Sequence, residues 1–381
     1  MEKYYKRLLT ETIMEYLLNF PVVAILGPRQ CGKSTLAKEI TSSMPSVFLD
    51  MEDDSDLQKI TEPKLFFEAN KNKLVCIDEI QLKPDLFPAL RGIVDKNKKN
   101  GQILISGSAS RDLIKQSSES LAGRIAYLEL TPFLESEIKD ISIDELWLKG
   151  GFPRSILASN NKFSYIWRKN FIQTYLERDI PQLGFNIPAQ TLKRLWTMIA
   201  HISGQLLNSS KLGNSIGVSH TTLRKYIDLL TQTYMVRVLM PYQSNIKKRL
   251  VKSPKIYIKD TGILHNLLQI ETYNELLGNP VFGNSYESFV IEQICSRFED
   301  WEQSFYRTSA GAEIDLVLTK GTQMIAIEIK ASATPRPTKG FWNAIEDLKP
   351  TRIYVIGIIK DSYFIREDVK VTSLREFLGE Y

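Results

Sequence analysis

The feature that most constrains the fold is the segment GPRQCGKST at residues 27–35, which fits the pattern G-x-x-x-x-G-K-[ST] without a mismatch. An apolar run at residues 22–26 predicts a buried strand before it, and residues 36–40 predict a helix after it. Gly27 and Gly32 allow the backbone to turn back with its N–H groups pointing inward. Because the helix N-terminus adds partial positive charge at the same place, this order predicts a phosphate-binding loop.

The loop also predicts roles for its side chains. We expect ATP and Mg²⁺ as ligands, with Lys33 reaching the β- and γ-phosphates and Ser34 ligating Mg²⁺. The alternative is an ordinary glycine-containing turn before a helix, but the flanking strand and helix favour the phosphate loop. The residues predicted to hold the nucleotide are Gly27, Pro28, Arg29, Gln30, Cys31, Gly32, Lys33, Ser34 and Thr35.

A second strand carries two carboxylates at its end. Residues 74–77 are apolar, and Asp78 and Glu79 follow them directly. In open parallel sheets ligands bind at the carboxyl ends of the strands. We therefore expect Asp78 to hold Mg²⁺ through water, as a Walker-B aspartate does, and Glu79 to activate the attacking water as general base. The pair is more typical of a hydrolase than of a small-molecule kinase, and the alternative is a buried strand followed by chance acids.

A third strand, at residues 103–105, ends in small polar residues at the same predicted edge. A hydroxyl at this place is suited to sensing the γ-phosphate, and Ser108 is the first candidate, with Ser106 the second. A simple turn at the strand end is an equally good interpretation.

Four segments, GPRQCGKST, VCIDEIQ, ILISGSAS and SLAGRIAYLEL, occur in this order. Together they resemble a prokaryotic family of AAA+ ATPases related to the archaeal ATPases. The residues GGFP at 150–153 are similar to a GG-x-P segment of that family. The resemblance implies an arginine, often from a neighbouring subunit, that completes the site; Arg124 and Arg111 are the candidates. An arginine suits this role because its planar fork meets phosphate with two hydrogen bonds.

The middle of the chain predicts helices and then a winged helix. A helical pattern at 163–183 indicates a lid or bridge. A further amphipathic helix is expected at 191–203, and residues 207–230 have a helix-turn-helix pattern. Two wing strands are expected at 234–239 and 255–259, with six basic residues between positions 247 and 259. Packing without DNA contact is the open alternative. The residues predicted to contact DNA phosphates are Thr221, Arg224, Lys225, Lys247, Lys248 and Arg249.

The C-terminal part predicts a second acidic site. If Gly321-Thr322 forms a two-residue hairpin loop, Asp315 falls opposite Glu328, on the face that also carries Lys330. Carboxylates in this arrangement suit Mg²⁺ or Mn²⁺, with Glu287 completing the ligands and Lys330 acting as a catalytic lysine.

The D…E-x-K pattern resembles the PD-(D/E)xK nuclease fold, as in Holliday-junction resolvases. It is also similar to the domain of unknown function that usually follows this type of ATPase. Ile314 stands where that nuclease pattern has its proline. Ordinary surface charges on an αβ core are the alternative, and the sequence leaves DNA cleavage open.

Length and composition set the organisation. The 381 residues suggest about two or three domains, and 43% hydrophobic and 24% charged content is ordinary for a globular protein with real cores. The expected fold class is α/β, with a parallel P-loop sheet in the first domain. We expect an AAA+ P-loop domain at 1–135, a helical lid at 136–190, a winged helix at 191–260 and a restriction-endonuclease-like αβ domain at 261–381. The net charge of +5 permits nucleic acid as a partner without requiring it.

The remaining expectations concern location and partners. The cysteines Cys31, Cys76 and Cys295 lack paired spacing and indicate reduced thiols of a cytoplasmic protein. No apolar run approaches ~20 residues, so no membrane contact is expected, and the N-terminus does not resemble a signal peptide. The predicted function is ATP hydrolysis coupled to DNA binding. The alternatives are a nucleotide-dependent switch that binds a protein partner and an active Mg²⁺-dependent nuclease, and a homo-oligomer is compatible with each.

Overall fold

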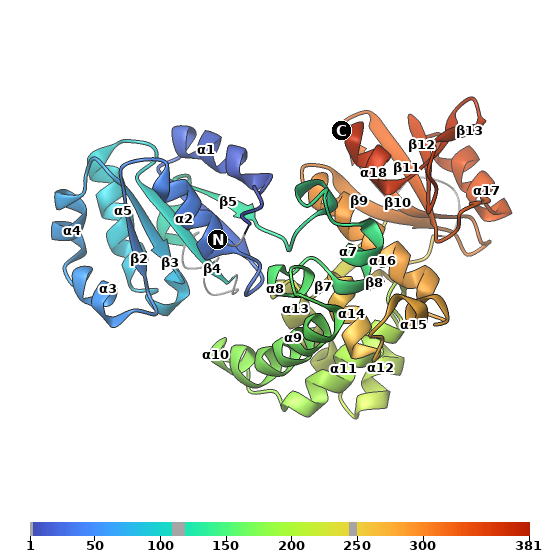
Figure 1. Cartoon of the computed structure of the whole chain (residues 1–381), viewed down its shortest axis with the longest axis horizontal. Helices are drawn as coiled ribbons and strands as arrows, with labels where there is room; N and C mark the ends of the chain where they lie inside the picture. The colour runs from blue at the N-terminus through green and yellow to red at the C-terminus, as the bar shows by residue number, and fades with distance from the viewer. Residues whose placement is uncertain (1–2, 109–118, 244–249) are drawn as a thin grey trace. The chain divides into compact units, whose positions relative to one another are not determined.

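The computed structural model describes residues 3–108, 119–243 and 250–381. The chain forms two compact units. The first comprises Met1–Phe133 together with Gln232–Tyr234, and the second comprises Leu134–Thr231 and Met235–Tyr381. In Figure 1 the first unit is drawn in blue to cyan, and the second runs from green to red.

The first unit is built on a five-stranded sheet in the order β2-β3-β4-β1-β5. All neighbouring strands are parallel, as predicted for a P-loop fold. Strand β4 lies between β1 and β3, so the ends of these three strands meet at one edge. The strands are β1 Val22–Gly27, β2 Ser46–Asp50, β3 Leu74–Asp78, β4 Ile103–Ser108 and β5 Ile125–Glu129.

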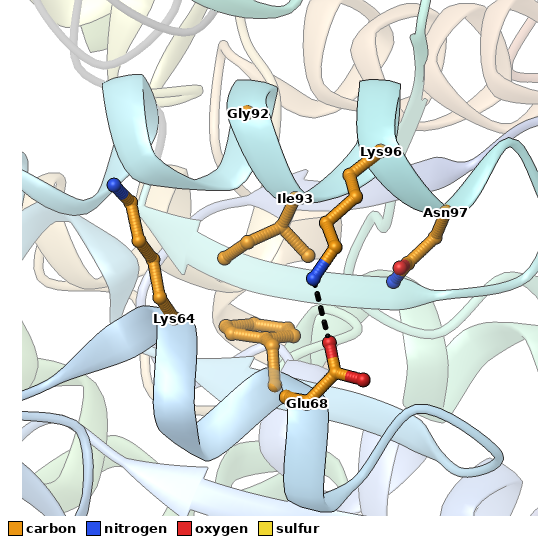
Figure 2. Close-up of a pocket in the computed structure, with 7 residues that line it drawn as sticks. Lys64, Glu68, Gly92, Ile93, Lys96 and Asn97 are labelled. Atoms are coloured by element: carbon orange, nitrogen blue, oxygen red, sulfur yellow. Dashed lines mark hydrogen bonds and ion pairs between the residues drawn. The ribbon is translucent and has the colours of Figure 1, made fainter.

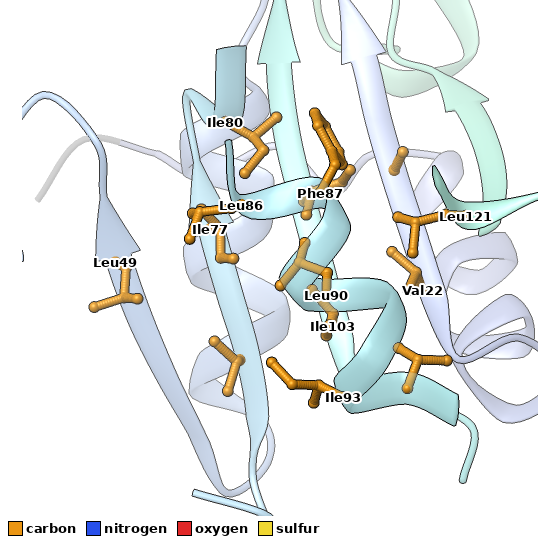
Figure 3. Close-up of a cluster of buried hydrophobic side chains, with 14 of the residues drawn as sticks. Val22, Leu49, Ile77, Ile80, Leu86, Phe87, Leu90, Ile93, Ile103 and Leu121 are labelled. Atoms are coloured by element: carbon orange, nitrogen blue, oxygen red, sulfur yellow. The ribbon is translucent and has the colours of Figure 1, made fainter. Parts of the chain in front are cut away.

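Helices pack on this sheet through alternate strand residues. Val22, Ala24 and Leu26 of β1 share one buried cluster with Leu90 and other side chains of α5 (Figure 3). This spacing follows from the period of two along a strand, which places every second side chain on one face. The helices of the unit are α1 Leu9–Asn19, α2 Lys33–Ser42, α3 Asp54–Lys59, α4 Pro63–Ala69 and α5 Leu86–Asn97, with a short 3-10 turn at Ile80–Leu82.

The second unit contains a nine-stranded sheet in the order β13-β14-β12-β11-β10-β9-β7-β8-β6. Strand β7 pairs with β8 in the antiparallel sense and with β9 in the parallel sense. The expected wing strands therefore belong to the same sheet as the C-terminal strands. The bounds are β6 Gln205–Leu206, β7 Val236–Pro241, β8 Lys255–Ile258, β9 Glu302–Arg307, β10 Glu313–Lys320, β11 Gln323–Lys330, β12 Arg352–Gly357, β13 Tyr363–Arg366 and β14 Val369–Thr372.

The helices of the second unit follow the predicted patterns closely. Helix α9 continues through a π-helical turn at Tyr175–Asp179 into α10, and a 3-10 turn at Glu135–Glu137 opens the unit. The helices are α7 Ile143–Lys149, α8 Pro153–Ile156, α9 Asn161–Thr174, α10 Ile180–Gln182, α11 Ala189–His201, α12 Ser209–Ile216, α13 His220–Gln232, α14 Thr261–Leu267, α15 Tyr273–Leu277, α16 Phe282–Arg297, α17 Lys339–Leu348 and α18 Leu374–Gly379.

The predicted helix-turn-helix pattern forms at α12 and α13. The side chain of Asn208 caps α12 by accepting a hydrogen bond from the N–H of Lys211 at 3.0 Å. Gly217 ends that helix at a φ of 74°, in the left-handed region that favours glycine. Ser219 accepts a hydrogen bond from the N–H of Thr222 at 3.1 Å at the start of α13. The cap and stop residues expected from the sequence therefore have these roles.

A buried polar chain crosses the core of the second unit. The indole N–H of Trp147 donates to Ser285 Oγ at 2.9 Å, and Ser285 Oγ lies 2.7 Å from His265 Nε2. The other ring nitrogen, Nδ1, lies 2.9 Å from the carbonyl oxygen of Leu148. A neutral imidazole satisfies every group in this chain, with Nδ1 as donor and Nε2 as acceptor. Burial lowers the pKa of His265 to about 3, which keeps the ring neutral.

This histidine predicts an acid-sensitive stability. His265 has an ordinary pKa of 6.5 and a folded value of about 3, so unfolded chains take up a proton first as the pH falls. Its contribution to stability is complete above pH 6.5 and decreases from there toward pH 3. Between pH 7 and pH 5 the loss should be about 1–2 kcal/mol. In His265→Gln this loss is absent, so urea unfolding at the two pH values should show a smaller decrease than wild type.

The matched control is His220→Gln, because His220 is exposed on α13. Its unfolding free energy should follow the wild-type pH dependence. An unchanged pH dependence in His265→Gln would contradict the account of the buried ring.

Candidate functional site

The phosphate loop lies at the end of β1, and helix α2 begins at Lys33. Gly32 precedes that helix at a φ of 104°, in the left-handed region that favours glycine. Lys33 is 4% exposed, and its Nζ donates to the carbonyl oxygens of Gly27 at 3.2 Å and Pro28 at 2.8 Å. The lysine is thus folded onto its own loop, where its charge is available to a bound phosphate.

Asp78 ends β3, which is separated from the loop strand β1 by β4, and is 2% exposed. The hydroxyl of Ser106, on the neighbouring strand β4, donates to Asp78 Oδ1. Ser108 lies two residues further along β4; its buried hydroxyl has no hydrogen-bond partner in the part of the chain that the structure describes. The two serine candidates therefore differ: Ser106 fixes the aspartate, and Ser108 keeps a hydroxyl that is available to a ligand.

Glu79 follows Asp78 at a φ of 53° and a ψ of 42°, which turns the chain sharply at the strand end. Gln81 Nε2 donates to Glu79 Oε2 and holds the carboxylate. Burial raises the pKa of Glu79, against the opposing effect of the Lys33 charge. A Cβ at position 107 would lie 2.4 Å from Gln81 Oε1, so Gly107 provides the space for this side chain. Gln81 belongs to the VCIDEIQ segment, but the sequence pattern did not predict a role for it.

Arg124 does not complete the site of its own chain. It precedes β5, and its carbonyl oxygen accepts from the N–H of Val22 at the start of β1. The loop lies at the other end of β1, about 16 Å away along the strand. Asp95 also holds the guanidinium, at 2.6 and 3.1 Å. Arg124 is therefore not placed to reach the loop of its own chain, and the other candidate, Arg111, lies outside the described residues.

Arg7 is a loop-positioning residue that the sequence analysis missed. It is 4% exposed, and it donates to the carbonyl oxygens of Cys31 at 3.0 Å and Thr131 at 2.6 Å. Its guanidinium also lies over the ring of Phe133, 4.7 Å from the centroid. Arg7 lies just before helix α1, which begins at Leu9. The only available signal was a basic residue among apolar ones near the N-terminus.

Removing this guanidinium should disturb the loop. In Arg7→Ala the buried carbonyl groups of Cys31 and Thr131 lose their charged partner, which should cost about 2–4 kcal/mol of stability. We also expect weaker ATP binding, because the loop backbone loses a support. Urea unfolding and ATP titration measure the two effects.

The control is Lys6→Ala. Lys6 pairs with Glu11 at 2.8 Å on the surface, and we expect no measurable change from its loss. Equal behaviour of the Arg7 and Lys6 variants would show that Arg7 does not support the loop.

The residues predicted to contact DNA fall into two groups. Thr221, Arg224 and Lys225 are exposed on α13, the second helix of the helix-turn-helix pattern. Lys247, Lys248 and Arg249 lie outside the described residues. Another member of the predicted basic wing, Lys255, is 2% exposed and does not belong to a surface patch.

The C-terminal carboxylates come together as the sequence predicts. Lys320 pairs with Gln323 across a two-residue turn, and Leu316 pairs with Ile327, which confirms the expected hairpin register. Lys330 Nζ lies 2.6 Å from Glu328 Oε1. Burial and the neighbouring Asp315 raise the pKa of Glu328 to about 8.

An unexpected lysine lies within this group. Lys255 Nζ is 3.1 Å from an oxygen of each of Glu287, Glu313 and Asp315. Burial alone would lower the pKa of Lys255, but the surrounding carboxylates outweigh it and hold that pKa well above its usual range. Among the described residues, no group of three or more His, Cys, Asp or Glu is arranged to hold a metal ion. The sequence placed Lys255 in the predicted basic wing, because the residues next to it in the chain do not indicate these acidic partners.

A pocket of about 350 Å³ lies between α4 and α5, away from the strand ends (Figure 2). Lys96 Nζ lies 2.9 Å from Glu68 Oε2 at its wall. None of the residues predicted to bind nucleotide lines it. Its walls are formed by Lys64, Phe67, Glu68, Gly92, Ile93, Lys96 and Asn97.

Comparison with known proteins identifies the family. Residues 19–139 match the family described as AAA domain. Residues 141–274 and 282–377 match two domains of unknown function, DUF8612 and DUF4143. An uncharacterized protein of Mycobacterium tuberculosis is 42% identical over 336 residues, which cover 88% of this chain and 76% of the relative. The chain belongs to a prokaryotic family of AAA+ ATPases.

Two further proteins are similar to this chain. An uncharacterized protein of Haemophilus influenzae is 23% identical over 84% of this chain and 86% of its own length. The structure of a Walker-type ATPase of Pyrococcus abyssi has a TM-score of 0.51 and 16% identity, and the match covers 70% of this chain and 97% of that one. This likeness shows a shared fold. Of the helices that the structure describes, none is both long and apolar enough to span a membrane.

Proposed function

We propose that the first unit of this AAA+ ATPase binds ATP with Mg²⁺ at the loop of residues 27–35 and hydrolyses it with Glu79 as the general base. The observation that supports this most is the meeting of three strand ends at one sheet edge. Strand β1 contributes the loop, β3 contributes Asp78 and Glu79, and β4 contributes Ser106 and Ser108. Ligands of open parallel sheets bind at this edge.

The groups at the three strand ends have different roles in binding the nucleotide. The loop N–H groups and Lys33 bind the phosphates, and Ser108 contacts the γ-phosphate. Ser34 and Asp78 hold Mg²⁺; their oxygen atoms suit this hard cation, and Ser106 fixes the Asp78 carboxylate. Mg²⁺ supplies neutralising charge on the phosphate oxygens.

The chemical step uses the carboxylate of Glu79. It accepts a proton from the water that attacks the γ-phosphate, and ADP and inorganic phosphate leave. Gln81 orients this carboxylate through its side-chain amide. Arg124 can assist this step only from a neighbouring copy, because it lies at the other end of β1 from the loop of its own chain.

Two substitutions separate binding from hydrolysis. Lys33→Ala should weaken ATP binding strongly, because the buried ammonium that faces the phosphates is lost. Glu79→Gln should bind ATP as tightly as wild type but release phosphate at least about 100-fold more slowly. Fluorescent-nucleotide titration and phosphate-release kinetics measure these effects.

Lys96→Ala is the matched control, because Lys96 lies in the pocket between α4 and α5. This variant should bind and hydrolyse ATP normally. If Lys96→Ala lost ATP binding while Lys33→Ala kept it, the nucleotide site would be that pocket and the proposal would fail.

We also propose that the second unit contacts DNA through a winged helix. The order α11, β6, α12, α13, β7 and β8, with β6 and β7 on either side of β8, supports this interpretation. Helix α13 exposes Thr221, Arg224 and Lys225, whose side chains suit phosphate oxygens. A nucleotide-dependent contact with a protein partner is the competing function of the same helix.

The double variant Arg224→Ala/Lys225→Ala tests the DNA contact. If both cations bind phosphates, its affinity for duplex DNA should fall and the slope of log K against log salt should decrease by about 2. The matched control is Lys162→Ala/Lys169→Ala, which removes two exposed lysines from α9. Wild-type protein that does not bind DNA at low salt would exclude DNA and favour the protein partner.

A further inference from the structure

We infer that Lys255 is an internal counter-ion that takes the place of a divalent cation in the C-terminal acidic cluster, so that this cluster holds the second unit together and does not cleave DNA. The cluster consists of Glu287 on α16, Glu313 and Asp315 on β10, and Glu328 and Lys330 on β11.

The ammonium group of Lys255 is fully used within the cluster. It has three N–H donors, and three carboxylate oxygens surround it at 3.1 Å, from Glu287, Glu313 and Asp315. Its side chain is only 3% exposed. Mg²⁺ and its relatives need oxygen ligands at about 2.0–2.6 Å, so a metal ion would have to displace the lysine from its position.

Most other oxygens of the cluster are also occupied. Asp315 Oδ2 accepts from the N–H of Ile329 at 3.0 Å, and Glu287 Oε1 also accepts from the hydroxyl of Tyr257 at 2.7 Å. Glu328 Oε1 contacts Lys330, which leaves Glu328 Oε2 as a buried oxygen without a partner among the described residues. Glu287 contacts Lys255 and Tyr257 through Oε1 alone, so its Oε2 also has no partner among the described residues. Two such oxygens do not provide most of the ligands that a hard cation needs.

The backbone of Lys255 is fixed within the sheet. It begins β8, which lies between β7 and β6 in the sheet. Its ammonium also lies 5.7 Å from the centroid of the Phe305 ring on β9. A divalent cation placed beside this buried charge would be strongly repelled, because charges in the interior are weakly screened.

The arrangement also joins the middle and C-terminal segments, which the pairing of β7 with β9 already brings into one sheet. Lys255 comes from the strand pair that was expected to be a separate wing, whereas its partners come from α16 and β10. An ion pair of this kind fixes the two segments together, and removing one partner would leave buried charges uncompensated.

Titration of the full chain with Mn²⁺ tests the inference, with isothermal calorimetry on wild type, Asp315→Asn and Glu328→Gln in the absence of nucleotide. We expect wild type and both variants to show the same weak background. Mn²⁺ binding by wild type that is lost in either variant would overturn the inference. The use of two variants, both of which keep the side-chain shape, protects the comparison if one of them does not fold.

A second arm removes the proposed counter-ion. Lys255→Met keeps much of the side-chain volume without the charge and should bind Mn²⁺ about 10-fold or more tightly than wild type. This gain should disappear in Lys255→Met/Asp315→Asn. If Lys255→Met folds and gains no binding, the lysine does not stand in for a cation. Plasmid DNA incubated with Mn²⁺ and wild type should stay intact, and cutting that Glu328→Gln lacks would also overturn the inference.

Discussion

One buried guanidinium holds together the parts of the first unit on which nucleotide binding depends. Arg7 bonds the backbone of the phosphate loop at Cys31 and the backbone at Thr131, where the chain leaves the sheet. The loop lies close against that segment, because a Cβ at position 27 would be 2.2 Å from the carbonyl oxygen of Leu130. The absence of a side chain at Gly27 therefore allows this close approach of the two backbones as well as the turn. The loop, the start of α1 and the end of the sheet form one packed assembly.

The sequence predicted the strand–loop–helix arrangement and the acidic strand end well, because each depends on residues close together in the chain. The loop glycines, Lys33 and the Asp78-Glu79 pair have fixed short spacings, and the parallel sheet brings them to one edge. Prediction failed where a partner lies far away in sequence. The Arg7–Thr131 and Ser106–Asp78 contacts depend on the order of strands in the sheet, which local patterns do not contain. Arg124 looked suitable as a motif residue, yet strand direction takes it away from its own loop.

In the second unit, too, contacts between residues close in sequence were predicted, and contacts between distant residues were not. The hairpin register that joins Asp315 and Glu328 followed from a two-residue turn and a period of two, and the structure has that register. Lys255 was assigned to a basic surface because its neighbours in sequence are basic. Its neighbours in space are acidic, since β8 and β10 belong to one sheet. Two carboxylates of the nuclease-like pattern, Glu287 and Asp315, thus form ion pairs with Lys255.

The most direct test of the account is a crystal structure of the full chain with Mg²⁺ and a non-hydrolysable ATP analogue. We predict the analogue's phosphates in the loop of residues 27–35, with Lys33 Nζ moved from the carbonyl oxygens of Gly27 and Pro28 onto phosphate. Arg7 should still bond Cys31 and Thr131. An analogue bound elsewhere, with Lys33 still on both carbonyl oxygens, would contradict the account.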